Sequence, residues 1–182
     1  MASDGDRPAV TRARVLDAAL LLADECGLEA LSMRRIGKTL GVEGMALYNH
    51  VANKDEIIDG MVDMVFAEIT LPPADIDWKS AIRARCISAR QVLNRHWWAA
   101  PLMETRTSPG PASLSHHDAV IGCLRRGGMS LQMTAHAYAI LDSFLYGFAI
   151  QEARLPFHGD EPSVPLDELA AGMLEAMPKD MF

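Results

Sequence analysis

The 182-residue sequence lacks any uninterrupted run of about 18 apolar residues, which is the length that a membrane-spanning helix needs. Residues 1–10 contain acids and no apolar stretch, so they do not match a signal peptide, and we expect a disordered tail there. Only three cysteines are present, far apart and odd in number, which argues against a disulfide framework and indicates a reducing compartment. These absences predict a cytoplasmic protein that does not enter a membrane.

Positive charge is also scarce, because the chain carries a net charge of −7. On its face, such an acidic balance argues against a nucleic-acid partner. The balance reverses locally between residues 31 and 54, where Arg34, Arg35, Lys38 and Lys54 are opposed only by Glu43, which leaves a local charge of +3. A basic surface is therefore expected on one part of an acidic protein.

The apolar residues recur at helical spacing, and we find no convincing strand. In the first part of the chain, good capping residues stand at the ends of the helical segments. These segments run from Thr11 to Gly27, from Ser32 to Gly41, over residues 43–50, and from Asn53, which forms a capping-box pattern with Glu56, to a stop before Pro72.

The double proline at 72–73 is the best candidate for a domain boundary. Beyond it, the pattern predicts further helices that are separated by loops rich in glycine and proline. They comprise a helix from the Asp77 cap to about residue 96, a loop at 108–113, a helix that ends at Gly127, a long segment from the Ser130 cap over 131–155, a loop at 156–165 and a helical piece from near Leu166.

The segment 43–50 combines aromatic, amide, imidazole and thioether side chains on one short helix. At 100° per residue, if Leu47 points into the core, Met45 and Asn49 point to the opposite side, with Ala46 and Tyr48 on the flanks. Two short helices joined by a glycine turn, the second with an uncharged outer face, are typical of a helix-turn-helix. A plain helical hairpin would show the same periodicity, so this pattern alone leaves both interpretations open.

The motifs GLEALSMRRI, LGV, ALYNHV and NKDE follow one another over residues 11–65. In this order and spacing they resemble the N-terminal DNA-binding domain of the tetracycline-repressor (TetR) family. The resemblance implies that one set of residues contacts double-stranded DNA, and that Tyr48, His50 and Lys54 within it touch the backbone. The implied set is Ser32, Met33, Arg34, Gly44, Met45, Ala46, Tyr48, Asn49, His50 and Lys54.

This sequence departs from the family where base specificity is determined. The founding repressor has hydrogen-bonding side chains where this chain has Gly44 and Ala46. We therefore expect Arg34, Asn49 and apolar contact with thymine methyl groups to read the bases, and a different operator sequence. For His50, a capping or solvated histidine remains the alternative.

The stretches LNRHWWAAPLMETRTSPGP, LRRGGMS and SFLYGFAIQEA resemble, more weakly, the family's C-terminal domain, which implies a helical effector-binding and dimerisation domain. The family's magnesium-binding positions correspond here to Leu102 and Gln151, which are poor magnesium ligands, so we expect neither a tetracycline–magnesium effector nor any metal or cofactor. An apolar pocket or simple core is expected around the aromatic residues. The expected effector-binding residues are Trp97, Trp98, Met103, Thr105, Arg106, Tyr138 and Asp142.

The segment 131–155 is apolar on most sides, which predicts burial on most sides. One face is smooth, because the small residues Ala135, Ala139, Ser143 and Gly147 recur at every fourth position, and small residues let another helix approach closely. Asp142 on a second stripe needs a partner if it is buried, and Arg106 or a ligand donor could supply it. Partial solvation of this stripe is the alternative.

Enzyme patterns are weak in this sequence. The GKT at 37–39 lacks the earlier glycine and the preceding strand of a phosphate-binding loop, and the adjacent histidines His116 and His117 do not share a helix face. We therefore expect no enzyme. The rival class is a helical small-molecule-binding protein without DNA function, which would explain the second domain but not the local charge reversal.

The sequence thus predicts an all-α protein with a disordered tail at 1–10, a three-helix helix-turn-helix domain at 11–71 and a helical effector-binding and dimerisation domain at 74–182. We expect a homodimeric repressor that a small, mostly apolar molecule of unknown identity releases from a palindromic operator. The family's last long dimerisation helix has no counterpart before the chain stops. Either the chain is truncated or its dimer is built differently.

Overall fold

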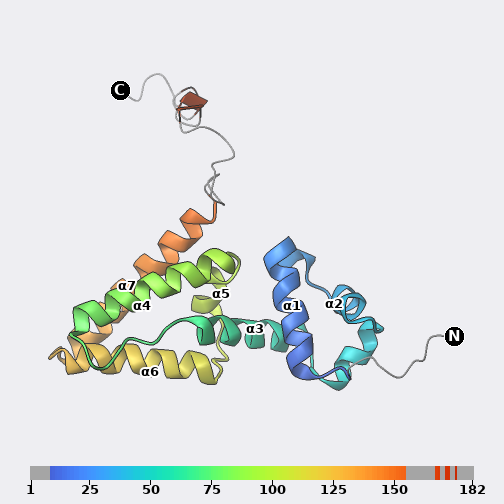
Figure 1. The fold of residues 1–182 in the computed structure, drawn as a ribbon, viewed down its shortest axis with the longest axis horizontal. Coiled ribbons are helices and arrows are strands. Elements are labelled where there is room, and N and C mark those ends of the chain that lie inside the picture. Colours follow the sequence, from blue (N-terminus) through green and yellow to red (C-terminus); the bar gives the residue numbers. More distant parts are fainter. Residues whose placement is uncertain (1–8, 155–166, 169–170, 173–174, 176–182) are drawn as a thin grey trace.

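The computed structural model describes residues 9–154, 167–168, 171–172 and 175, and the regular structure over these residues is entirely helical. Figure 1 shows a small helical unit that holds α1 and α2, joined through α3 to a unit built from α4, α5, α6 and α7. The all-α prediction is confirmed. The expected tail at 1–10, the loop at 156–165 and the helical piece from Leu166 lie wholly or mostly outside the described residues.

The first two helices begin and end at the capping residues that the sequence predicts. Helix α1 (Arg12–Cys26) begins after Thr11, whose hydroxyl accepts a hydrogen bond from the Arg14 N–H at 3.3 Å. Helix α2 (Met33–Leu40) begins after Ser32 in the same manner, and it ends at Gly41, whose φ of 72° is a left-handed conformation that favours glycine.

The segment after this turn is the 3₁₀ helix η2 (Gly44–Asn49), not the α-helix over 43–50 that the periodicity predicts. The His50 N–H bonds to the Leu47 carbonyl in the i→i+3 pattern, which is common in a helix too short for several α-helical hydrogen bonds. Leu47 is fully buried, as predicted. A Cβ atom on Gly37 would lie 2.8 Å from the Val42 carbonyl oxygen, so glycine permits the close packing of α2 on η2.

Helix α3 (Lys54–Glu68) extends from the small unit into the second one (Figure 1). The capping box forms in a modified version: the Glu56 N–H donates to Asn53, as predicted, whereas the Glu56 carboxylate accepts from the Ala52 N–H at 2.7 Å. Ile57 and Met61 on this helix are fully buried in a core that continues from α1 into the second unit. A displacement of α3 would therefore change the packing of both units.

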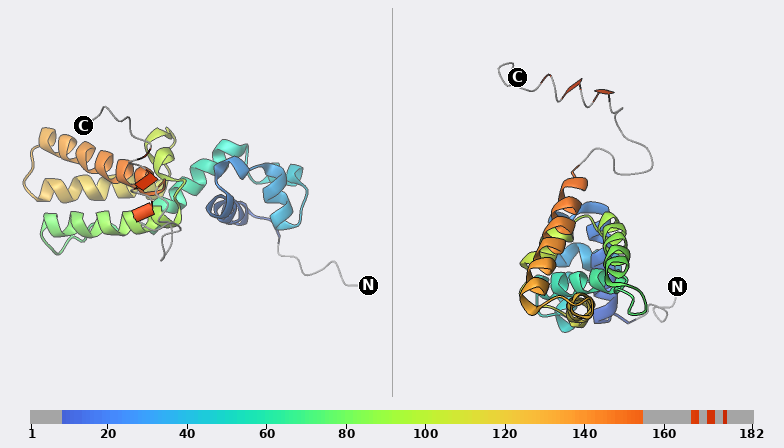
Figure 2. Two further views of the ribbon diagram at one scale, coloured as in Figure 1. Left: turned by 90° about the horizontal axis from the view of Figure 1, so that it is seen from above. Right: turned by 90° about the vertical axis from the view of Figure 1, so that its left-hand side faces the viewer.

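In the second unit, α4 (Trp78–Arg95), α6 (Pro111–Arg126) and α7 (Leu131–Glu152) lie side by side, as Figure 2 shows. The Asp77 and Ser130 caps form as predicted. Two details differ from the prediction: α6 begins at Pro111, inside the expected loop, because proline is well suited to a first helical position, and an unpredicted short helix, α5 (Ala100–Thr105), precedes it.

Helix α7 is buried on one side only within this chain. Asp142, Leu145 and Tyr146 are buried, whereas Ile140 and Phe144 are 69% and 72% exposed. The small residues at 135, 139 and 143 lie on the exposed side with them. Over the described residues, the prediction that this helix is buried on most sides is therefore wrong, because one whole side of it faces solvent.

Candidate functional site

The outer face of η2 is uncharged and open to solvent. Met45 is 77% exposed and Tyr48 47% exposed, and Asn49 is also exposed, while Leu47 on the opposite side anchors the helix in the core. Met45 and Asn49 are thus exposed on the outer side, where the sequence places them, and Tyr48, expected on a flank, is exposed beside them.

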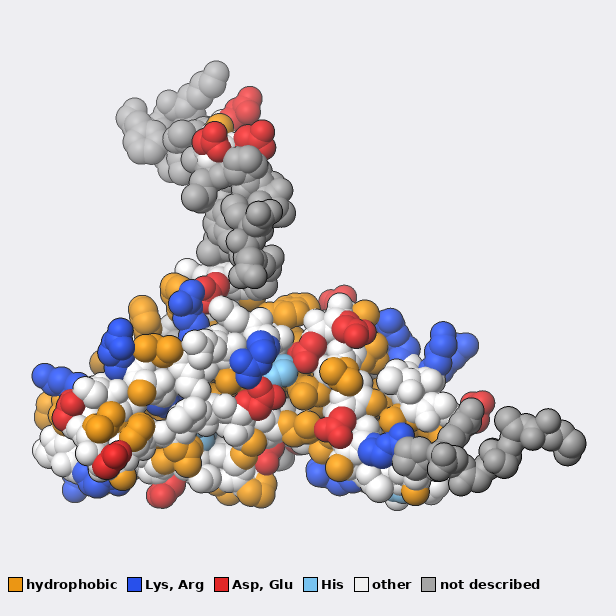
Figure 3. Space-filling view, in the orientation of Figure 1, with side chains coloured by type: hydrophobic (Ala, Val, Ile, Leu, Met, Phe, Trp, Pro, Cys, Tyr) orange, Lys and Arg blue, Asp and Glu red, His pale blue; other side chains and the backbone are white. Residues whose placement is uncertain are grey.

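Exposed basic side chains lie on the helices that precede and follow η2. Arg34, Arg35 and Lys38 on α2 and Lys54 at the start of α3 are all exposed. Figure 3 shows Lys and Arg side chains around the end of the molecule that carries α2. This arrangement is suited to a DNA duplex, because Lys and Arg side chains contact phosphates while an uncharged face can approach the base edges.

Other residues of the expected DNA-contacting set are partly engaged in the fold. The Ser32 hydroxyl caps α2, and Met33 packs partly against the core. A Cβ atom on Gly44 would lie 3.0 Å from the Met33 backbone, so close packing of the helices explains the glycine at this position. Ala46 and His50 are half-buried.

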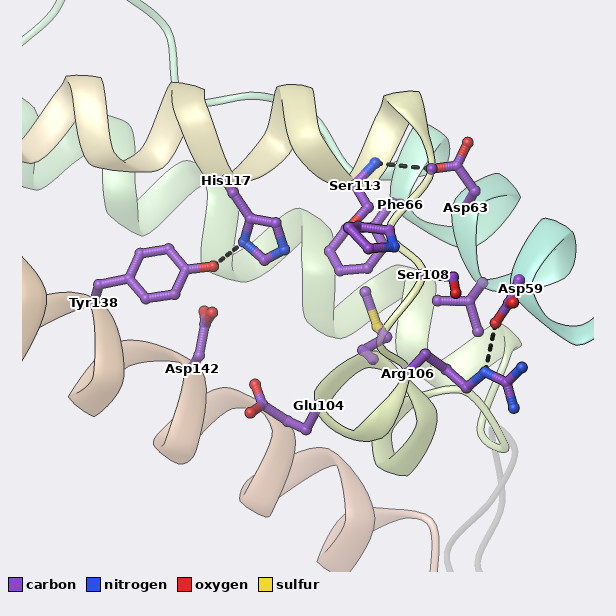
Figure 4. A pocket seen from close by; sticks show the side chains of 14 residues that line it. Asp59, Asp63, Phe66, Glu104, Arg106, Ser108, Ser113, His117, Tyr138 and Asp142 are labelled. Atoms are coloured by element: carbon purple, nitrogen blue, oxygen red, sulfur yellow. Dashed lines mark hydrogen bonds and ion pairs between the residues drawn. The ribbon is translucent and has the colours of Figure 1, made fainter.

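A cavity of about 280 Å³ lies in the second unit, enclosed by α3, α5, α6 and α7 (Figure 4). One part of its wall is apolar and includes Val62, Phe66 and Met103. The remaining wall is polar and carries four carboxylates. The complete lining is Asp59, Val62, Asp63, Phe66, Met103, Glu104, Arg106, Ser108, Pro109, Gly110, Ser113, His117, Tyr138 and Asp142.

The acids contributed by α3 have partners in the loop and helix that follow α5. Asp63 accepts a hydrogen bond from the Ser113 N–H at 2.8 Å, which caps the first turn of α6. Asp59 pairs with Arg106, which also reaches Asp55 at 3.2 Å. These pairs, drawn in part in Figure 4, join α3 to Arg106 and to the start of α6.

Asp142 at the base of the cavity is 4% exposed, and Arg85 of α4 is its ion-pair partner at 3.0 Å. The prediction that Arg106 pairs with Asp142 is wrong, because Arg106 is held by acids of α3 while Arg85 lies buried between α4 and α7. Although burial disfavours its charge, the Asp142 carboxylate raises the pKa of Arg85. The buried, paired state of Asp142 also excludes the partly solvated alternative for this residue.

The same guanidinium donates from Nε to His116 Nε2 at 2.9 Å, which places the imidazole proton on Nδ1. Burial, together with the charges of Arg85 and His117, lowers the pKa of His116 to about 3, so the ring is neutral at physiological pH. A hydrogen bond between His117 and Tyr138 continues the polar network toward the cavity (Figure 4).

The structure separates the expected effector-binding residues into two groups. Met103, Arg106, Tyr138 and Asp142 line the cavity. Trp97 and Trp98 instead line a second hollow of about 400 Å³, between the end of α1 and the ends of α5 and α7. Thr105 lines neither of these, and its hydroxyl donates to the Pro101 carbonyl.

Sequence reasoning missed several residues that line the cavity, above all Asp59, Asp63 and Glu104. Sequence reasoning treated α3 only as a helix that links the two domains. The spacing of four residues between Asp59 and Asp63 could have indicated that both acids lie on one face of this helix. Among the residues that the structure describes, no three His, Cys, Asp or Glu side chains come close enough to hold a metal ion.

Two family models match this chain. Residues 15–61 match the model described as "Bacterial regulatory proteins, tetR family", and residues 71–174 match "Tetracyclin repressor-like, C-terminal domain". The second match covers more than half of the chain. In the part of the chain that the structure describes, no helix is both long enough and apolar enough to span a membrane.

Individual proteins support both matches. The transcriptional repressor DrrR1 of Streptomyces coeruleorubidus is 33% identical over 150 residues, which cover 81% of this chain and 55% of DrrR1. The class D tetracycline repressor of Escherichia coli is 28% identical, with 92% of this chain and 78% of the repressor covered. The structure of Streptomyces coelicolor ActR in complex with actinorhodin has a TM-score of 0.78 at 28% identity, with 93% and 79% covered.

Proposed function

Because this chain belongs to the TetR family, we propose that it is a ligand-responsive repressor that binds a palindromic DNA operator as a homodimer. The observation that carries the proposal is the uncharged, exposed face of η2, with exposed cations on α2 and at the start of α3, in a chain whose net charge is −7. The chain spans only about half the length of DrrR1.

In this proposal, η2 enters the major groove while the basic side chains meet the backbone on either side. Tyr48, His50 and Lys54 are assigned to phosphates, with Ser32 and Met33 near the backbone at the start of α2. Arg34 and Asn49 are assigned to base edges, and Met45 and Ala46 to thymine methyl groups. Gly44 lets η2 sit close to α2 and contributes no side chain to the contact.

Dimerisation is assigned to the exposed side of α7. Ile140, Phe144 and Phe148 are 69%, 72% and 41% exposed there, beside a stripe of small residues. Such an apolar patch on a water-soluble helix marks an interaction surface, and an isologous contact between two copies would bury it. Two-fold symmetry would then present two copies of η2 to two operator half-sites.

The cavity between α3 and α7 is assigned to the effector. ActR, whose solved complex contains actinorhodin, shares this fold and supports the assignment. Because α3 both lines the cavity and packs against α1, a ligand that shifts α3 would change the orientation of the DNA-binding unit. A coupling of about 1–3 kcal/mol would change DNA affinity about 5- to 150-fold.

Selection from a random duplex library, followed by fluorescence anisotropy on the enriched sequence, tests the DNA assignment. We expect enrichment of a palindrome and binding by a dimer in sedimentation. A monomer that enriches no sequence would contradict the proposal and favour the helical small-molecule-binding protein without DNA function.

A further inference from the structure

We propose that the effector carries a protonated amine, which the cavity receives between Glu104 and Asp142, on a compact apolar ring skeleton. This inference rests on the proposed function of the cavity and adds the chemical class of the molecule that it selects. The observations that carry it are the charge of the lining, the state of Glu104 and the distribution of polar and apolar walls.

The cavity has an excess of negative charge. Its lining contains the four carboxylates of Asp59, Asp63, Glu104 and Asp142 but only one guanidinium, that of Arg106. With Arg85 behind Asp142 counted as well, two negative charges remain uncompensated. A cationic ligand would be attracted to this site, whereas a carboxylate or phosphate ligand would be repelled by it.

Glu104 is the acid that the protein leaves available. Within the described residues, no hydrogen bond or ion pair engages its carboxylate, in contrast with Asp59, Asp63 and Asp142, which each have a partner. Figure 4 shows the Glu104 carboxylate directed across the cavity toward Asp142. Partial desolvation and the Asp142 charge raise the pKa of Glu104, which means that a cation placed between the two acids would relieve an existing repulsion.

A buried hydroxyl, that of Tyr146, lies near this pair but outside the lining of the cavity. The Tyr146 side chain is 3% exposed, and its hydroxyl meets no hydrogen-bond partner in good geometry over the described residues. It lies among the charges of Asp142, Arg85 and Glu104. A ligand nitrogen with several N–H donors could engage both carboxylates.

The geometry favours an organic cation over a metal ion. The acids of the lining come from three helices, and in the described part of the chain they do not converge as a set of three ligands. The lining also contains the apolar side chains of Val62, Phe66 and Met103, which suit a ring system. A volume of about 280 Å³ is small for a binding site, so the ligand end that enters is compact.

Three probes with one skeleton and different charges test the inference: 1-naphthylmethylamine, which is protonated at neutral pH, 1-naphthalenemethanol and 1-naphthylacetate. Their affinities for the full chain are measured by isothermal titration calorimetry. We expect the amine to bind about tenfold more tightly than the alcohol, which is the expected scale for a hydrogen bond to a charged group, and the carboxylate to bind most weakly.

Glu104→Gln removes the charge from an exposed side chain and preserves its shape, so the variant should fold. We expect the preference for the amine to fall to within about threefold of the alcohol in this variant, because a neutral amide cannot form the charge-assisted bond. Asp118→Asn, which neutralises an exposed acid of α6 outside the cavity, is the matched control and should retain the preference.

The inference is overturned if the amine binds wild-type protein no more tightly than the alcohol, whether both bind or neither does. It is also overturned if Glu104→Gln keeps the full preference. These results would leave DNA binding untouched, because operator affinity is measured separately. Conversely, a protein that selects no operator but shows the charge preference would contradict the proposed repressor function alone.

Discussion

The indole Nε1 of Trp98 donates a hydrogen bond to the carboxylate of Asp24, 2.7 Å away, and so joins the start of α5 to the end of α1. The same carboxylate lies 2.8 Å from Nδ1 of His96, whose Nε2 lies 3.1 Å from Glu68 at the end of α3. One acid of the unit that holds α1 and α2 therefore contacts two side chains of the second unit. This contact joins the two units, in addition to the core that they share around α3.

Replacing Asp24 with alanine should destabilise the protein by about 1–3 kcal/mol, because two partly buried donors lose their acceptor. Urea unfolding measures the free-energy change. Asp17→Ala, on an exposed position of the same helix, is the control and should stay within about 0.5 kcal/mol of wild type. Equal effects of the two substitutions would show that the Asp24 contact does not stabilise the fold.

Asp142→Asn should cost about 3–5 kcal/mol of unfolding free energy, because it leaves the buried Arg85 charge without a counterion. The control is Arg90→Gln, since Arg90 forms an exposed ion pair with Glu152, and such pairs contribute about 0–1 kcal/mol. Chemical denaturation of both variants gives the comparison. A loss below about 1 kcal/mol for Asp142→Asn would contradict the proposed burial of the pair.

His116 should make the protein sensitive to acid. The pKa of its imidazole is about 3 in the folded protein, against 6.5 for an unperturbed histidine. Between these values the unfolded chain binds a proton that the folded state excludes, so the free energy of unfolding falls as pH falls. The slope from this residue approaches about 1.4 kcal/mol per pH unit.

His116→Gln keeps an acceptor for Arg85 but cannot titrate. Between about pH 6 and pH 4, the slope of the unfolding free energy against pH should therefore become shallower by up to about 1.4 kcal/mol per pH unit, which corresponds to one proton. Denaturant unfolding at a series of pH values measures this slope. His136→Gln, at an exposed position on α7, should leave the slope unchanged. An unaltered slope in His116→Gln would mean that other groups control acid unfolding.

For the proposed DNA contact, Tyr48→Ala and Lys54→Ala should weaken binding to every sequence, since both residues are assigned to phosphates. Lys54→Ala should also reduce the slope of log K against log salt by about one unit. Asn49→Ala should instead change the preference at about one or two base pairs. A uniform loss of affinity across a randomised operator library in Asn49→Ala would contradict its role in reading bases.

The helix ends of the first unit were predicted closely from sequence, because their signals are local. Thr11, Ser32 and Asn53 cap the helices that follow them through bonds to residues three positions away, and Gly41 ends α2 in a left-handed turn. Leu47, which the sequence reasoning took to point into the core, is fully buried. The sequence did not predict that η2 is a 3₁₀ helix. In so short a segment, the spacing of apolar side chains does not distinguish a 3₁₀ helix from an α-helix.

Sequence alone therefore determined the helical class, the capping residues and the buried side of each short helix, since these follow from neighbours within a few positions. The tertiary structure decided which distant charges meet. Arg85 and Asp142 are 57 residues apart, and Arg106 was an equally charged candidate that α3 instead holds through Asp59. The acidic lining of the cavity likewise depends on how α3, α5, α6 and α7 pack, because electrostatic pairing acts over distance in space and not along the chain.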